Sequence, residues 1–156
     1  MTFTSLIFLH SFFRWILLLS LIYAVFRGIK SWFGDKSFTQ TDNMLRQYTA
    51  SLSHLQLLIG VWLYFISPSI SYFLSNFKEA VHIKNIRFFA MEHSLMMVIA
   101  ILIVTVGSIV TKRMKTPEGK IKSQVIFFGL ALLIIFVSIP WPFLSFSVPR
   151  PYFRGF

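Results

Sequence analysis

The feature that most constrains this chain is a set of four long apolar runs. Each run is close to the 20 residues that an α-helix needs to cross about 30 Å of hydrocarbon. The runs predict membrane spans at about residues 6–26, 48–66, 88–110 and 125–139. With 56% hydrophobic and only 13% charged residues, the composition excludes an ordinary water-soluble domain. We therefore expect an all-α fold, in which residues 1–156 form one integral membrane domain, an up-down-up-down four-helix bundle.

The segments outside the four spans also carry structural signals. Between the second and third spans, residues 69–84 place apolar side chains at spacings of three and four, which predicts an amphipathic helix lying on the membrane. We expect Thr41-Asp42-Asn43 to cap the second span and Ser67-Pro68 to end it. After Ile139, four prolines among aromatic residues predict a non-helical tail along the membrane interface.

The basic residues predict the orientation of the chain. There are 15 Lys and Arg residues against five Asp and Glu, but in a membrane protein this excess reports topology and lipid attraction rather than nucleic-acid binding. The loops 27–47 and 111–124 carry nine basic residues, and the opposite side carries five. The positive-inside rule places these two loops in the cytoplasm, so both termini face the periplasm if the host membrane is a bacterial inner membrane.

Ionisable groups inside the predicted spans are costly, so each is a candidate functional residue. They are His10, Arg14, His54, Glu92 and His93. His10 and His93 lie early in the first and third spans, which run in the same direction, so both imidazoles are expected about 6–8 Å inside the outer surface. These two spans are diagonal in the predicted bundle. The pair therefore predicts bis-histidine ligation of the iron of a b-type haem, with Gly60 at a similar level.

Several alternatives remain open for these residues. His10 and His93 are otherwise packed polar residues at helix ends, or contacts of a non-haem metal or a quinone. Arg14 and Glu92 are expected to form a buried ion pair. In functional terms, Arg14 would hold a haem propionate or a quinone carbonyl, and Glu92 would take up a proton during quinol chemistry.

Two further histidines have their own expectations. His54 is predicted to hydrogen-bond to the third span, where Thr105 and Ser108 are at similar depth, or to contact a quinone. His82 is expected on the outer surface, either solvated or completing a metal site with His10, Glu92 and His93. The chain has no cysteine, which excludes disulfides, iron–sulfur clusters and c-type haem attachment.

Several short segments carry a resemblance to known proteins. They are Leu9-His10-Ser11, Arg14-Trp15, His54 to Gly60, Tyr64-Phe65, Ser67-Pro68, Glu92-His93 and Pro140-Trp141-Pro142-Phe143. With these segments the chain resembles a family of four-span Bacteroidetes proteins labelled cytochrome b-like. More distantly, it is similar to b561-type cytochromes and to the bacterial membrane-bound protoporphyrinogen oxidase. The resemblance to b561-type cytochromes implies haem ligation by intramembrane histidines, which carries over to His10 and His93, with His54 as a further position.

The sequence thus predicts a small b-type haem protein that transfers electrons in the membrane and exchanges them with quinol. One alternative is a haem-free accessory subunit packed in a larger respiratory or transport complex. Another is a membrane redox enzyme that acts on porphyrin. The chain has no glycine-rich phosphate loop, no Ser-His-Asp set and no acid pair of the glycosidase kind. Any catalysis is therefore expected to be redox chemistry.

Overall fold

The computed structural model describes residues 2–34 and 37–141, and this part of the chain is built from α-helices. The main elements are α1 (Phe3–Phe33), α2 (Gln40–Ile66), α6 (His93–Arg113) and α7 (Pro117–Ser138). Shorter helical segments precede α6, so that residues Lys84–Arg113 form one long helical stretch. Four helices are thus long and apolar enough to cross a membrane. The predicted all-α, multi-pass membrane fold is confirmed.

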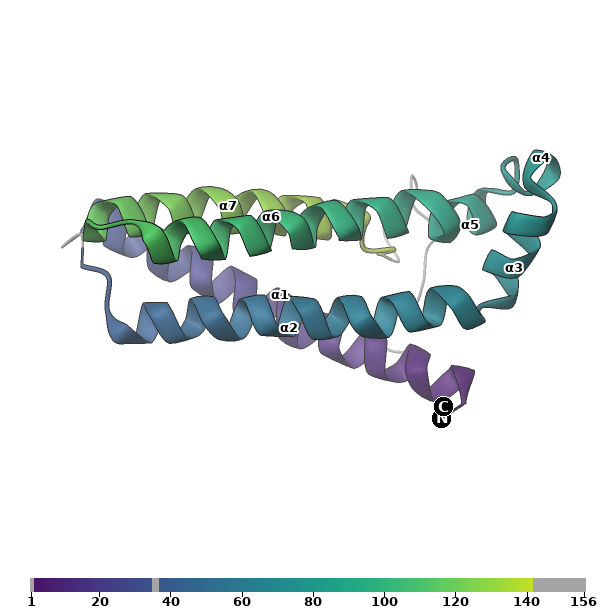
Figure 1. Cartoon of the computed structure of the whole chain (residues 1–156), viewed down its shortest axis with the longest axis horizontal. Helices are drawn as coiled ribbons and strands as arrows, with labels where there is room; N and C mark the ends of the chain where they lie inside the picture. The colour runs from purple at the N-terminus through teal and green to yellow at the C-terminus, as the bar shows by residue number, and fades with distance from the viewer. Residues whose placement is uncertain (1, 35–36, 142–156) are drawn as a thin grey trace.

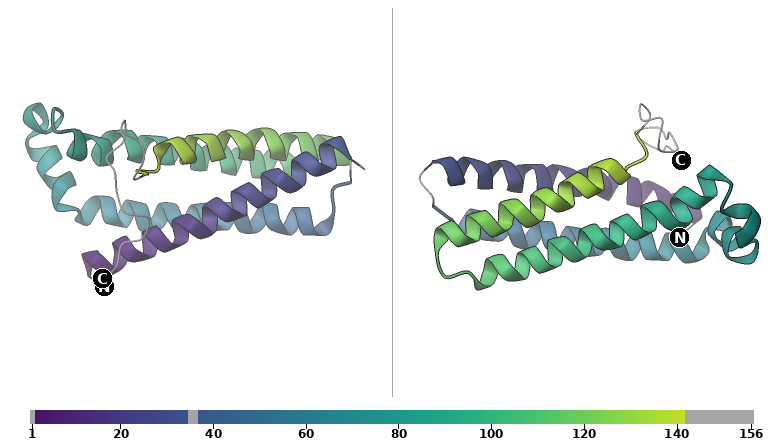
Figure 2. Two further views of the ribbon diagram at one scale, coloured as in Figure 1. Left: turned by 180° about the vertical axis from the view of Figure 1, so that it is seen from behind. Right: turned by 90° about the horizontal axis from the view of Figure 1, so that it is seen from above.

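The four long helices alternate in direction and form a bundle (Figures 1 and 2). Around the bundle, α1 packs on α2 and α7, while α6 packs on α7 and α2. Helices α1 and α6 are therefore diagonal, as the sequence predicted. Figure 1 also shows that α1 crosses the bundle at an angle and diverges from α6 and α7 toward its N-terminus.

The helices are longer than the apolar runs from which they were predicted. Helix α2 begins at Gln40, since Thr39 and Asp42 form a reciprocal capping box, so the expected cap at Thr41-Asp42-Asn43 is wrong. Helix α7 begins at Pro117, because the Thr116 side chain accepts a hydrogen bond from the Gly119 N–H. The loops predicted over 27–47 and 111–124 therefore shrink to residues 34–39 and 114–116. The predicted end of α2 before Ser67-Pro68 is confirmed.

The segment after α2 is not the single amphipathic helix expected over 69–84. It consists of α3 (Pro68–Ser75) and α4 (Phe77–Ala80), followed by a turn and α5 (Lys84–Arg87). The break falls at Asn76, whose backbone leaves the helical region at φ −130° and ψ 47°. Ile70 and Phe73 are buried against the end of the bundle, whereas Leu74 and Phe77 of the same predicted apolar face stay exposed. The expected tail after Ile139 lies largely outside the described residues, which end at Trp141.

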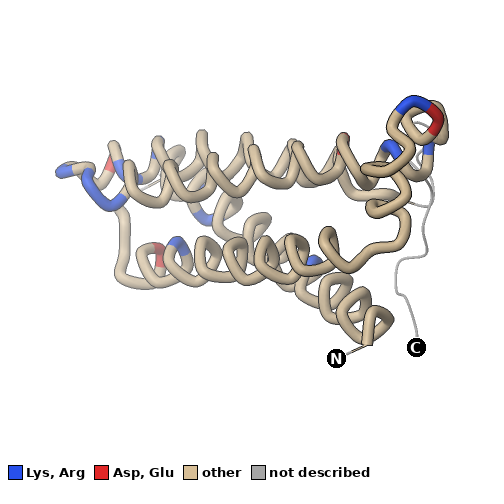
Figure 3. The backbone as a smooth tube through the Cα atoms, turned by 45° about the vertical axis from the view of Figure 1, so that its right-hand side comes forward, with Lys and Arg blue, Asp and Glu red and all other residues tan. Residues whose placement is uncertain are grey.

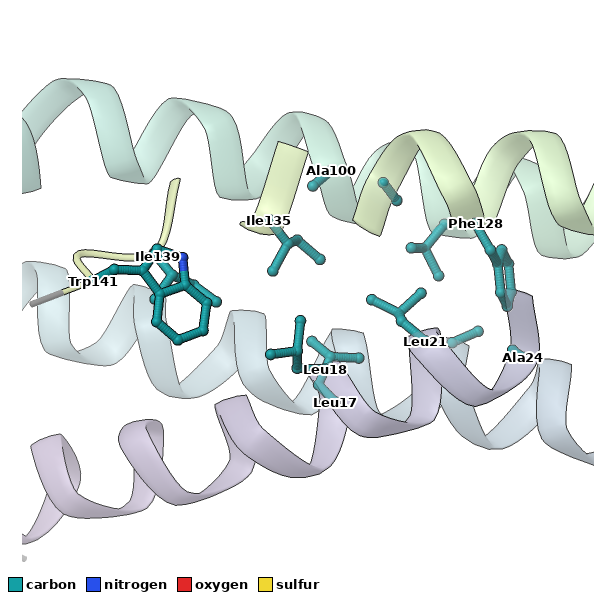
Figure 4. Packing of buried hydrophobic residues seen from close by; sticks show 12 residues of the cluster. Leu17, Leu18, Leu21, Ala24, Ala100, Phe128, Ile135, Ile139 and Trp141 are labelled. Atoms are coloured by element: carbon teal, nitrogen blue, oxygen red, sulfur yellow. The ribbon is translucent and has the colours of Figure 1, made fainter. Parts of the chain in front are cut away.

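The core of the bundle is a cluster of apolar side chains packed between the helices (Figure 4). Its buried cluster is Leu17, Leu18, Leu21, Ala24, Ala50, Ala100, Val104, Phe128, Ala131, Ile135, Ile139 and Trp141. Small residues let the helices approach closely, as is common between membrane helices. At Gly107 of α6, an added Cβ would lie only 2.3 Å from Cβ of Phe127 in α7. This contact therefore requires glycine.

Candidate functional site

The two histidines that the sequence singled out from the first and third spans lie side by side in the structure. The ring centres of His10 and His93 are 6.5 Å apart, and the ring planes are 77° from parallel. They come from the diagonal helices α1 and α6, which have little other contact with each other. The expectation that both imidazoles lie at one level inside the bundle is confirmed.

The position of His93 is set by the segment that precedes it and by the end of α7. Residues Phe88–Glu92 form one π-helical turn, a wider turn that often occurs at functional sites. The Nδ1 atom of His93 lies 2.9 Å from the carbonyl oxygen of Ser138. Because a carbonyl only accepts hydrogen bonds, Nδ1 must carry the proton, and in the neutral ring Nε2 keeps its lone pair. Metal-binding histidines commonly have this arrangement.

His10 is held differently, against α2. An added Cβ at Gly60 would lie 3.3 Å from Cε1 and 3.8 Å from Nδ1 of His10, so the imidazole packs directly on the glycine backbone. The Gln56 side chain donates a hydrogen bond of 2.9 Å to the His10 carbonyl oxygen. Within the described part of the chain, Nδ1 of His10 is buried without a hydrogen-bond partner. A buried polar atom of this kind is costly unless something else satisfies it.

Two aromatic rings pack near His93, and a tryptophan pair lies beyond the end of α7. The rings of Phe88 and Phe89 lie 5.9 Å from that of His93, measured between ring centres. Trp15 of α1 meets Trp141 at 5.8 Å, just beyond the end of α7. Phe12, by contrast, is 48% exposed and faces away from the protein interior. The surroundings of the pair are therefore mainly apolar on the side of α6 and α7.

Arg14 lies one turn after His10 on α1, and its charge is close to both imidazoles. Its Nη2 atom donates a hydrogen bond of 3.3 Å to Ser11, and its guanidinium lies 5.4 Å from the ring centre of Trp15. The predicted ion pair between Arg14 and Glu92 is wrong. Glu92 instead binds Arg87, with Nε and Oε1 2.7 Å apart. The π-helical turn explains this choice, because it brings residues five apart onto the same face.

His54 makes the interhelical contact that was expected of it. Its Nε2 lies 2.9 Å from Oγ1 of Thr105 in α6. The side chain is otherwise exposed. His82 is exposed as well, and the predicted metal site with His10, Glu92 and His93 is not formed. Among the described residues, no group of three or more metal-ligating side chains is close enough to hold an ion.

Sequence reasoning missed the polar groups at the opposite end of the bundle. Asp42 is buried and binds Arg27, with Oδ1 and Nε 2.7 Å apart. Arg46 is 3% exposed and donates hydrogen bonds to Ser108 of α6. Both arginines were counted as residues of a cytoplasmic loop. The capping signal Thr-x-x-Asp at residues 39–42 would have extended α2 and placed Arg46 inside a helix.

The comparisons with known proteins add no relative: no family model, no curated protein and no solved structure matches this chain. The class of this protein is therefore defined only by its fold and by the geometry of the site. It is a four-helix membrane protein with two imidazoles facing each other near one end of the bundle. The resemblance to cytochrome b-like proteins remains a prediction.

Proposed function

We propose that this protein is a small b-type cytochrome that binds haem through His10 and His93 and transfers electrons within the membrane. The observation that carries the proposal is the 6.5 Å between the two ring centres. At this separation both histidines could hold one metal ion, since N–metal bonds are about 2 Å long. Haem supplies reversible one-electron chemistry of its iron when bound.

The donor set fits this group in three respects. The Ser138 carbonyl fixes the tautomer of His93 that leaves Nε2 available as a ligand. His10 is a buried imidazole whose Nδ1 atom is unsatisfied among the described residues. Gly60 lets the His10 ring pack directly on the backbone of α2, a position from which any other residue would push it. Two imidazoles at one level of the bundle, with lone pairs available, are what bis-histidine haem binding requires.

The remaining site residues have supporting roles in this proposal. The positive charge of Arg14, near both imidazoles, suits a haem propionate. Exposed His54, hydrogen-bonded to Thr105, is placed to contact a quinol that approaches from the lipid. Glu92, bound to Arg87 at the protein surface, is accessible for proton exchange with water. Quinol is therefore the proposed electron donor or acceptor.

The proposed location is a bacterial inner membrane with both termini in the periplasm. Its support is the excess of basic residues in the segments 27–47 and 111–124, nine against five on the opposite side, and the described Lys and Arg residues are concentrated at one end of the bundle (Figure 3). Since the chain has no cysteine, single cysteines can report the orientation. In intact cells, Asn76→Cys is expected to react with an impermeant thiol reagent, and Lys115→Cys only after permeabilisation. The reverse pattern would invert the proposed topology.

The test of haem binding is an absorbance spectrum of the detergent-purified protein, oxidised and then reduced with dithionite. A Soret band and a sharp α band are expected, with about one haem per chain by the pyridine haemochrome assay. His10→Ala and His93→Ala should each abolish the signal. The matched controls His54→Ala and His82→Ala should retain it, and all four variants should elute as folded protein in size-exclusion chromatography.

Two outcomes would contradict the proposal. Equal loss of haem in all four histidine variants would exclude His10 and His93 as the specific ligands. A featureless spectrum from cells grown with ample haem would exclude haem binding and favour the haem-free accessory subunit. Turnover of a porphyrin substrate by the haem-loaded protein would instead identify the redox enzyme.

A further inference from the structure

A polar hollow lies at the basic end of the bundle, where α2 begins, α6 ends and α7 begins. Its volume is about 430 Å³, and it is lined by Phe38, Thr39, Gln40, Asn43, Arg46, Gln47, Lys112 and Lys120. Figure 3 shows the concentration of Lys and Arg at this end of the molecule. Three of the lining residues are cationic, and within the described ranges none of them is acidic. The hollow is therefore a site of positive potential.

The most informative residue in the lining is Arg46, which is only 3% exposed. Its guanidinium donates to the Ser108 carbonyl at 3.0 Å and to Asn43 Oδ1 at 2.9 Å and 3.3 Å. These acceptors are all neutral. Asp42, one turn earlier on α2, is bound by Arg27 and Thr39. Arg46 is thus a buried positive charge held by neutral groups, an arrangement that favours an anionic ligand.

Several other groups around the hollow can donate hydrogen bonds. Oδ1 of Asn43 accepts both hydrogen bonds from Arg46, so the part of this amide left for a ligand is its Nδ2 donor. Lys120 is positioned by Phe38, with Nζ 5.6 Å from the ring centre. Gln40, the first residue of α2, adds a side-chain amide whose N–H groups are donors. A ligand with several acceptor oxygens and a negative charge matches this set.

We propose that the hollow binds a phosphate group, supplied by the headgroup of an anionic phospholipid. The depth supports this source, since Lys112 directly follows the third apolar run and so lies where a membrane helix meets the headgroups. Basic pockets between membrane helices on the cytoplasmic side are suited to such headgroups. The site is independent of the histidine pair, because it lies at the opposite end of the bundle and shares no residue with it.

The test is lipid binding to the purified, full-length protein, measured by native mass spectrometry in detergent. Phosphatidylglycerol is titrated, with phosphatidylcholine as the zwitterionic comparison and inorganic phosphate as the free anion. The variant K112Q/K120Q removes two exposed or half-exposed lysines of the hollow and leaves buried Arg46 in place. The matched control R113Q/K115Q removes the same charge from the same end of the bundle, but neither residue lines the hollow.

We expect phosphatidylglycerol to bind at least tenfold more tightly than phosphatidylcholine, and K112Q/K120Q to weaken it about tenfold. The control should change the affinity less than twofold. Binding of inorganic phosphate with the same sensitivity to K112Q/K120Q would support the phosphate site and identify a free anion as its source. Equal weakening in both double variants would overturn the proposal, because it would show diffuse attraction rather than a site. Absence of any preference for the anionic lipid, together with no binding of phosphate, would also overturn it.

Discussion

At one end of the bundle Asp42 binds the Arg27 side chain and the Thr39 hydroxyl and N–H. At the other end, His10 and His93 face each other, and Nδ1 of His10 has no partner among the described residues. Both ends therefore hold polar groups inside the protein. The Asp42 carboxylate has a full set of hydrogen-bond partners, whereas one ring nitrogen of His10 has none within the part of the chain that the structure describes. Satisfied networks stabilise a fold, whereas unsatisfied buried groups are expected where a ligand binds. The difference separates the Asp42 network, whose carboxylate is fully paired within the protein, from the histidine pair, where one ring nitrogen is left for a ligand.

The largest effect on stability is expected from Asp42→Ala. This change removes the capping box of α2 and leaves Arg27, which is 29% exposed, without its carboxylate. We expect a loss of about 2–3 kcal/mol in the free energy of unfolding, measured in mixed micelles, with unchanged haem content. The control is Glu118→Ala, which breaks the exposed pair with Lys122 and should cost less than about 0.5 kcal/mol. Equal effects of the two changes would contradict the structural role of the Asp42 network.

The next largest effect is expected from Gly107→Ala, in the contact between α6 and α7. Its Cβ would overlap Phe127, so the helices must separate, at a cost of about 1–3 kcal/mol. The matched control is Gly129→Ala on α7, where an added Cβ meets nothing within 4 Å. That variant should be neutral or slightly more stable, since alanine favours helix. An equal loss in the free energy of unfolding in both variants would show that the close contact at Gly107 does not require glycine.

Gly60→Ala tests the surroundings of the histidine pair. The new Cβ would lie 3.3 Å from Cε1 of His10, so the imidazole must move by a few tenths of an ångström. We expect a shifted reduction potential or altered α band, with a stability change below about 1 kcal/mol. Gly107→Ala should leave both spectral properties unchanged. A spectral shift of the same size in Gly107→Ala would remove the distinction between the two ends.

The smallest effect is expected from Thr105→Val, which keeps the side-chain shape and removes the hydrogen bond to His54. Hydrogen bonds between membrane helices contribute about 0.6 kcal/mol on average, so the loss of stability should be of that size. Haem content should not change. A loss of haem in this variant would contradict the proposed ligands, because it would indicate that His54 belongs to the haem site.

The comparison also shows which features could be predicted from the sequence. The apolar runs predicted four helices, and the residues Ser67-Pro68 predicted the end of α2. The level of His10 and His93 followed from helix direction and rise per residue. By contrast, the partner of Glu92 was predicted as Arg14 and is Arg87. That choice depends on the π-helical turn at Phe88–Glu92, which leaves no clear signal in residue pattern, since it inserts an extra residue into an ordinary helix.

Chain length and hydropathy determined the spans, because helix geometry and bilayer thickness are fixed quantities. They did not determine that residues 68–83 would fold back on the bundle, with Ile70 and Phe73 buried. The spacing of apolar residues in this segment fits a single helix lying on the membrane. It fits equally well the short helices α3 and α4 packed against Tyr64 of α2 and Ala90. Only the tertiary structure placed the Ser138 carbonyl at His93 and Gly60 at His10. These contacts join residues far apart in the chain, and they depend on how the helices cross, which no single helix encodes by itself.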